Sequence, residues 1–185
     1  MTKTPAPLRS RLISAAGSLV ERAGSTDAVS LRAIAREAGV TAPAVYGHFA
    51  DLEALLDAVL DQGFADLRAG IAAAVAGSAD PVERLVAGCH AYVRFGLAAP
   101  ARYRAMFGPR RLPSGQRAFA VLVDAVAACA AAGRSRSTDP REDARLLWTA
   151  LHGVVALRAA GGDADWPPLE EQVDVLVARL ALLGG

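Results

Sequence analysis

The sequence predicts an all-α protein, and three observations lead to this fold class. Apolar residues recur every three or four positions along most of the chain, which is the period of an amphipathic helix. No segment alternates apolar and polar residues convincingly over the length of a strand. With 53% hydrophobic and 21% charged residues, the 185-residue chain can bury a sizeable core. We therefore expect about nine helices, three in an N-terminal head and the others in a C-terminal helical bundle.

The helices of the predicted head begin and end at recognisable signals. The first helix covers about residues 8–23 and is broken at Gly24. Ser30 is a suitable N-cap for the second helix, which stops at Gly39 because glycine readily takes the left-handed conformation. Thr41 can cap the third helix.

Further helices are expected after the head. Two of them start with the sequence Asp-Pro-x-Glu, at Asp80 and Asp139, where the aspartate can cap the helix and proline suits its first position. Pro100 ends one helix, and residues 108–115 form a loop rich in proline, glycine and arginine. The expected helices cover about residues 51–75, 80–98, 101–107, 117–132, 139–160 and 167–185.

Basic residues are concentrated near the N-terminus. The whole chain carries a formal net charge of +1. Residues 1–50 have six basic and three acidic residues, a balance of +3, whereas residues 51–185 have 14 and 16, a balance of −2. A basic head on a slightly acidic body suits a module that faces phosphates, although ordinary surface charge explains the same bias equally well.

Several other classes of protein are disfavoured. Cys89 and Cys129 lie in apolar helical stretches without metal-ligand spacing, so we expect buried, inert thiols and neither a metal nor a cofactor. The N-terminus lacks the apolar run of a secretory signal, and the run Leu146–Leu157 is too short to span a bilayer. The sequence therefore predicts a cytoplasmic protein with no membrane partner.

The segment 31–49 has the layout of a helix-turn-helix. Two short amphipathic helices flank a tight turn at Gly39, and in such a motif the second helix lies in the DNA major groove. Ile34 and Val45 are among the inward positions that fix the angle between the two helices. A helical hairpin without a DNA role has the same pattern, so the pattern alone leaves both interpretations open.

The second helix of this motif presents a surface with few hydrogen-bond donors. The side chains that pair strongly with base edges are Arg, Lys, Asn and Gln, and residues 41–48 contain none of them. We therefore expect phosphate contacts and DNA shape to supply much of the recognition. The candidate DNA-binding residues are Arg32, Arg36, Thr41, Ala42, Pro43, Ala44, Tyr46, Gly47 and His48.

From Leu12 to Leu56 the chain resembles the TetR/AcrR family of bacterial transcription regulators. The matching residues are Leu31-x-x-Ile34-Ala35-x-x-Ala38-Gly39-Val40-Thr41, Val45-Tyr46-x-His48-Phe49 and Glu53-x-Leu55-Leu56. The resemblance implies that Tyr46 and His48 face phosphates and that Phe49 packs inside. Members commonly carry a lysine at the start of the fourth helix, where this chain has Asp51-Leu52-Glu53. The change removes a phosphate contact, and an acidic residue there suits a helix N-terminus.

A second signature lies in the C-terminal bundle. Trp148 and His152 are four positions apart and so share one face of a helix, and the segment resembles the Trp-x-x-x-His-Gly (WHG) sequence of one branch of the same family. The pair either lines a small-molecule pocket or belongs to the core as a packed tryptophan and a hydrogen-bonded histidine. The candidate pocket residues are Phe64, His90, Tyr92, Phe95, Tyr103, Phe107, Trp148 and His152.

The last two helices carry more apolar surface than one chain is expected to cover. The resemblance implies that these helices form a four-helix interface in a homodimer. A twofold dimer would place its two recognition helices ~34 Å apart, or a multiple of this, on a pseudo-palindromic site. The candidate interface residues are Leu147, Leu151, Val155, Val173, Leu176, Val177 and Leu180.

Together these features predict a ligand-responsive, DNA-binding transcription regulator, a homodimeric repressor released from double-stranded operator DNA by a small apolar or aromatic effector. Residues 1–50 would form the DNA-binding domain and residues 51–185 the ligand-binding and dimerisation domain. An alternative is a small-molecule-binding helical protein with a degenerate head, which fits the donor-poor recognition helix. An enzyme is not expected, because the three histidines form no catalytic or metal-binding array and no nucleophile motif is present.

Overall fold

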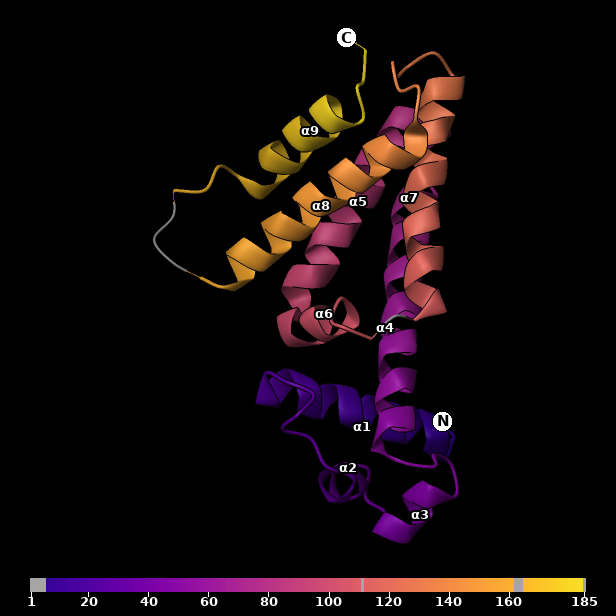
Figure 1. Cartoon of the computed structure of the whole chain (residues 1–185), viewed down its shortest axis with the longest axis vertical. Coiled ribbons are helices and arrows are strands. Elements are labelled where there is room, and N and C mark those ends of the chain that lie inside the picture. The colour runs from indigo at the N-terminus through magenta and orange to yellow at the C-terminus, as the bar shows by residue number, and fades with distance from the viewer. Residues whose placement is uncertain (1–5, 111, 162–164, 185) are drawn as a thin grey trace. The chain divides into compact units, whose positions relative to one another are not determined.

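The computed structural model describes residues 6–110, 112–161 and 165–184, and within these ranges it contains nine α-helices and no β-strand (Figure 1). The predicted all-α fold is therefore confirmed. The helices are Leu8–Ala23 (α1), Leu31–Glu37 (α2), Ala42–Tyr46 (α3), Leu52–Val75 (α4), Pro81–Ala98 (α5), Pro100–Met106 (α6), Pro113–Ala131 (α7), Pro140–Ala159 (α8) and Leu169–Leu180 (α9).

The described residues form two compact units. The head unit comprises residues 1–64 and 101–112, and the body unit comprises residues 65–100 and 113–185. The head unit extends beyond residue 50 because Leu55, Leu56 and Val59 of α4 belong to the same core cluster as the apolar side chains of α1, α2 and α3.

The short helix α6 belongs to the head unit. Glu21 of α1 caps it, because the carboxylate accepts hydrogen bonds from the backbone N–H groups of Ala101 (3.3 Å) and Arg102 (2.9 Å). The Tyr103 side chain is 1% exposed, and its ring centroid lies 4.8 Å from that of Phe107. A polar cap and an apolar anchor thus hold a helix of only seven residues.

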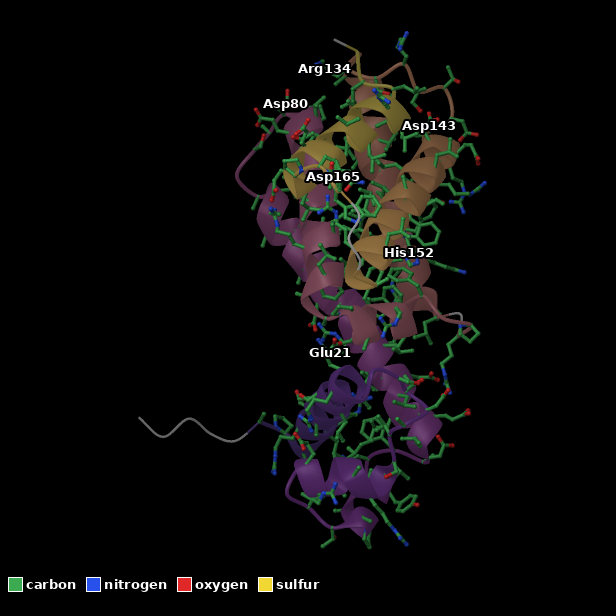
Figure 2. All side chains as sticks on the ribbon, turned by 90° about the vertical axis from the view of Figure 1, so that its left-hand side faces the viewer. Glu21, Asp80, Arg134, Asp143, His152 and Asp165 are labelled. Carbon is green, nitrogen blue, oxygen red and sulfur yellow. The ribbon has the colours of Figure 1, made fainter. Side chains whose placement is uncertain are left out.

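The body unit is a bundle in which α7 contacts α8 and α5, and α9 contacts α8 and α5. The two predicted Asp-Pro starts are confirmed. One carboxylate oxygen of Asp80 accepts hydrogen bonds from two backbone N–H groups at 2.9 and 3.0 Å. One carboxylate oxygen of Asp139 likewise accepts from two backbone N–H groups, both at 3.1 Å. Asp80 also pairs with Arg134 at 3.0 Å, and Figure 2 shows these side chains close together. Backbone hydrogen bonds to Asp80 hold the pKa of its carboxyl below the usual value, and the neighbouring Arg134 charge acts in the same direction.

Two predicted boundaries are wrong. Helix α7 begins at Pro113 rather than at residue 117, because proline is accommodated in the first turn of a helix. Helix α9 covers Leu169–Leu180 and ends before the predicted stop at the C-terminal glycines. The following residues leave the helix and pair with the segment before α8: the backbone N–H of Arg136 donates to the carbonyl of Leu182 at 2.9 Å.

Helix α7 is the one helix, among the residues that the structure describes, that is long and apolar enough to cross a membrane by length and composition. Its contacts with α5 and α8 make it a member of the body bundle.

Candidate nucleic-acid interface and effector domain

A tight turn connects α2 and α3. The hydroxyl of Ser30 accepts from the N–H of Ala33 at 3.3 Å, which confirms Ser30 as the N-cap of α2. Gly39 adopts a φ of 68°, the left-handed conformation that ends the helix, and the N–H of Val40 closes the turn onto the carbonyl of Ala35 at 2.9 Å. A side-chain nitrogen of Arg11 on α1 also donates to the carbonyl of Ala38. These bonds fix where α3 begins relative to α2.

Helix α3 has one fully buried residue, and its other residues are half-buried or exposed. Val45 is 0% exposed, whereas Tyr46 is 60% exposed. Figure 1 shows α2 and α3 as neighbours in the head, and the two helices are in contact. Of the other candidates on and beside α3, Thr41, Pro43, Gly47 and His48 are exposed, and Ala42 and Ala44 are half-buried.

The prediction that Thr41 caps α3 is only partly correct. Thr41 occupies the N-cap position with an extended backbone, but its side chain makes no capping hydrogen bond. Its exposed hydroxyl is therefore available to a phosphate.

The arginines of the head have different roles. Arg22 pairs with Glu37 at 2.8 Å, and the guanidinium of Arg9 lies over the Phe49 ring at 5.0 Å from its centroid. Arg32 and Arg36 are exposed on α2, and among the described residues neither has a side-chain hydrogen bond or ion pair. Both charges are therefore available to an external anion.

The acidic start of α4 is a helix cap. A side-chain oxygen of Asp51 accepts from the N–H of Ala54 at 2.8 Å, in the geometry of an N-cap. This confirms the interpretation that the acidic residue at this point suits a helix N-terminus.

An aromatic cluster in the body unit surrounds Trp148. Its indole N–H donates to the hydroxyl of Tyr92 at 3.0 Å, which fixes the ring between α8 and α5. The Trp148 ring centroid lies 6.0 Å from that of Phe119 and 5.9 Å from that of His152. Sequence analysis missed Phe119, because a single aromatic residue among alanines gives no signal of its neighbours.

His152 is half-buried on α8, where Figure 2 labels it. Burial lowers the pKa of its imidazole below the usual value, since a charged ring loses solvation there. Burial therefore favours the neutral ring, in which one nitrogen donates a hydrogen bond and the other accepts.

Four of the other predicted pocket residues have partners elsewhere. Phe64, Tyr103 and Phe107 lie in the head unit, with 5.4 Å between the ring centroids of Phe64 and Phe107. His90 on α5 instead lies 2.7 Å from the carboxylate of Asp174 on α9. Phe95 is half-buried on α5. The structure thus joins Tyr92, Trp148 and His152 in the body unit, and Phe64, Tyr103 and Phe107 form a separate aromatic group in the head unit.

Comparisons with known proteins extend these observations over nearly the whole chain. Residues 12–59 match the family model described as bacterial regulatory proteins, tetR family, and residues 85–180 match the tetracyclin repressor-like C-terminal domain. The second match covers more than half of the chain. The chain belongs to the TetR family.

Solved structures agree with this assignment. A protein of unknown function from Rhodococcus sp. RHA1 is 33% identical, with 98% of this chain and 97% of that chain covered and a TM-score of 0.84. The fatty acid degradation regulator FadR from Bacillus halodurans is 18% identical, with 99% and 98% covered and a TM-score of 0.72. A tetR-family regulatory protein from Rhodococcus RHA1 is 22% identical, with 96% of each chain covered and a TM-score of 0.70. The last two show the shared fold. No curated protein matches the chain.

Membership of the TetR family confirms the main functional prediction. The protein is a ligand-responsive, DNA-binding transcription regulator with a helix-turn-helix, and it is not an enzyme. Regulators of this family bind operator DNA, dimerise and bind small-molecule ligands. The finer assignment to the WHG branch stays a prediction.

The predicted dimer-interface residues need correction. Five of the seven lie in the core of the protomer at 0–1% exposure, where a second chain cannot touch them. They point toward the other helices of their own bundle because α8 and α9 each pack against α5. The five are Leu147, Leu151, Val155, Val173 and Val177. Leu176 and Leu180 are half-buried.

Proposed function

We propose that the protein is a homodimeric cytoplasmic repressor that leaves its operator when a small apolar or aromatic effector binds. Residues 1–50 supply the DNA-binding domain, and residues 51–185 bind the effector and the second chain. The observation that carries the proposal is the surface of α2 and α3, where Arg32, Arg36 and the 60% exposed Tyr46 project from a rigid core.

The contacts on DNA divide into two kinds. Arg32, Arg36, Thr41, Tyr46 and His48 bring charges or hydrogen-bond donors to phosphates, which position the protein without reading the sequence. The small residues of α3 let its backbone approach the groove and contact thymine methyl groups; they are Ala42, Pro43, Ala44 and Gly47. Operator choice then depends on DNA shape and on the spacing of two half-sites.

The effector is proposed to bind at the cluster of Trp148, Tyr92 and His152. The aromatic faces and the half-buried imidazole favour an uncharged or weakly polar aromatic molecule over an ion, because they offer stacking surfaces and hydrogen-bonding groups. An effector that binds one conformation of the dimer better than the other shifts the population toward it and changes the spacing of the two heads.

Dimerisation is proposed to use the exposed side of α8 and α9. Leu146 and Leu157 on α8 are 49% and 56% exposed, and Val175 on α9 is 42% exposed. Leu146 and Leu157 are 11 positions apart, which is about three helical turns, so they lie on one face. A twofold interface would pair this face with its own copy.

Replacing Tyr46 by alanine tests the DNA assignment. We expect binding to weaken by about tenfold, since a hydrogen bond to a charged phosphate is lost, and equally for a selected operator and a random duplex. Fluorescence anisotropy of labelled duplexes measures both. A loss confined to one sequence would contradict a phosphate role. If the wild-type chain retains no duplex above background at moderate salt, the degenerate-head alternative holds instead.

Replacing Leu157 by glutamate tests the dimer. Two symmetry-related carboxylates would meet at the interface, and we expect dimerisation to weaken by about a hundredfold or more, because like charges brought together cost several kcal/mol. Sedimentation equilibrium gives the dissociation constant. Val121→Glu on α7 is the matched control, since Val121 is also exposed, at 37%, but lies outside the proposed face. If the dimer persists in Leu157→Glu and dissociates in Val121→Glu, the interface lies on α7 instead.

A thermal-shift screen of small aromatic compounds tests the effector site. A ligand present at 100 times its dissociation constant stabilises the folded chain by about 2.7 kcal/mol and raises the melting temperature measurably. We expect the shift to disappear in Trp148→Leu, and duplex release by the same compound to disappear with it. A compound that stabilises both proteins equally would place the effector elsewhere.

A further inference from the structure

Three carboxylates gather at the start of α4, directly after the recognition helix. Asp51 caps α4, and Glu53 and Asp57 follow on its first two turns with side chains 78% and 42% exposed. His48 and Asp51 are three positions apart, so at most about 10 Å of chain separates them. That distance is about one Debye length at 0.1 M salt, and Glu53 and Asp57 follow Asp51 by two and six positions along α4. At lower salt, where the Debye length is longer, all three carboxylates disfavour a phosphate bound at His48 or Tyr46.

An arginine from a distant part of the sequence forms ion pairs with two of these carboxylates. Arg110 lies in the loop after α6, within the head unit. Its Nη1 lies 2.6 Å from Oδ1 of Asp57, and its Nη2 lies 3.4 Å from Oε1 of Glu53. Residues 53 and 57 are four positions apart and so lie on one side of the helix, where the forked guanidinium reaches both carboxylates.

We propose that Arg110 is a positioning residue for DNA binding, which acts through Glu53 and Asp57 by neutralising them beside the phosphate-facing surface. The inference rests on the docking of α2 and α3 proposed above. Arg110 is paired with carboxylates rather than aimed outward, so its contribution is to remove a repulsion and not to contact DNA itself.

Stability and DNA affinity separate this role from a structural one. Surface ion pairs contribute little to folding, and these three side chains are 35–78% exposed. A purely structural pair therefore predicts a small change in melting temperature and no change in affinity. Charge neutralisation beside the DNA surface predicts an equally small change in melting temperature but a loss of DNA affinity.

The test uses the full-length chain and a fluorescein-labelled random-sequence duplex at about 50 mM salt, where non-specific binding is measurable. We expect Arg110→Ala to weaken binding about fivefold with little change in melting temperature. Glu53→Gln with Asp57→Asn in the otherwise native chain should strengthen binding. The triple variant Arg110→Ala, Glu53→Gln, Asp57→Asn should bind at least as well as the wild type, because no uncompensated carboxylate remains at these positions.

Arg145→Ala is the matched control. It removes the same charge and an ion pair with Glu142 at 2.5 Å, but on α8 in the body unit, and it should leave binding unchanged. The proposal is overturned if Arg110→Ala binds like the wild type, or if the two amide substitutions fail to restore its binding. The second result would mean that Arg110 contacts phosphate directly. If the wild-type chain does not bind the duplex, the proposed function fails. If the wild-type chain binds and Arg110→Ala binds equally well, only the role of Arg110 fails.

Discussion

Val45→Asp is expected to abolish detectable DNA binding while the body unit stays folded. Val45 is 0% exposed and is the one buried residue of α3, a helix of five residues. A helix this short has no stability of its own, so its packing on the head core holds it in place. A carboxylate at this position would enter a cluster of apolar side chains and cost several kcal/mol. The recognition surface would then be lost although every contact residue is present.

The chain itself offers a way to separate local from global unfolding. Both tryptophans, Trp148 and Trp166, lie in the body unit, so their fluorescence reports on that unit alone. We expect unchanged tryptophan emission in Val45→Asp together with loss of duplex binding by anisotropy. Val45→Ile is the control: it keeps an apolar side chain and should bind DNA within a few-fold of the wild type. Full binding by Val45→Asp would mean that α3 is held by contacts other than Val45.

The sequence predicted those parts of the fold that depend on local chemistry. Ser30, Asp80 and Asp139 cap helices a few residues away, and Gly39 ends α2 by its own backbone conformation. Such signals act within one helical turn and can be read from a single segment. For the same reason the exposed surface of α3 was predictable, since an amphipathic period and one turn define it.

The long-range partners were not predictable from the sequence. Glu21 caps a helix that starts 79 positions later, and Arg110 pairs with a carboxylate 53 positions earlier. A charged residue on a helix is compatible with many partners, and tertiary packing alone selects one. No spacing rule connects such residues.

The predicted interface shows a second limit of sequence patterns. Periodicity shows that α8 and α9 each have an apolar side but cannot show what covers it. The most apolar positions, such as Leu151 and Val177, face the body core, at 1% and 0% exposure. The exposed Leu146 and Leu157 lie outside that stripe. A buried stripe and an interface therefore carry the same sequence pattern, and only the fold distinguishes them.

Tyr103→Ala is expected to lower the free energy of unfolding of the head unit by about 3–5 kcal/mol. The Tyr103 side chain is 1% exposed, and its ring packs on Phe107, which in turn meets Phe64 of α4 edge to face. Removing the ring leaves a cavity under α6, a helix of seven residues that has little stability alone. Urea denaturation followed by circular dichroism measures the loss, and hydrogen exchange of the α6 amides locates it.

Two comparisons distinguish anchoring of α6 from a general packing defect. Arg104→Ala, on the exposed side of the same helix, removes a hydrogen bond of 3.2 Å to the carbonyl of Gly24 and should cost less than about 1 kcal/mol. Glu21→Gln weakens the polar cap of α6 (Figure 2 labels Glu21). Because the cap and Tyr103 hold one short helix, their effects should not add, and we expect a coupling of at least about 0.5 kcal/mol in a double-mutant cycle. Strict additivity would show that α6 is held at two independent points.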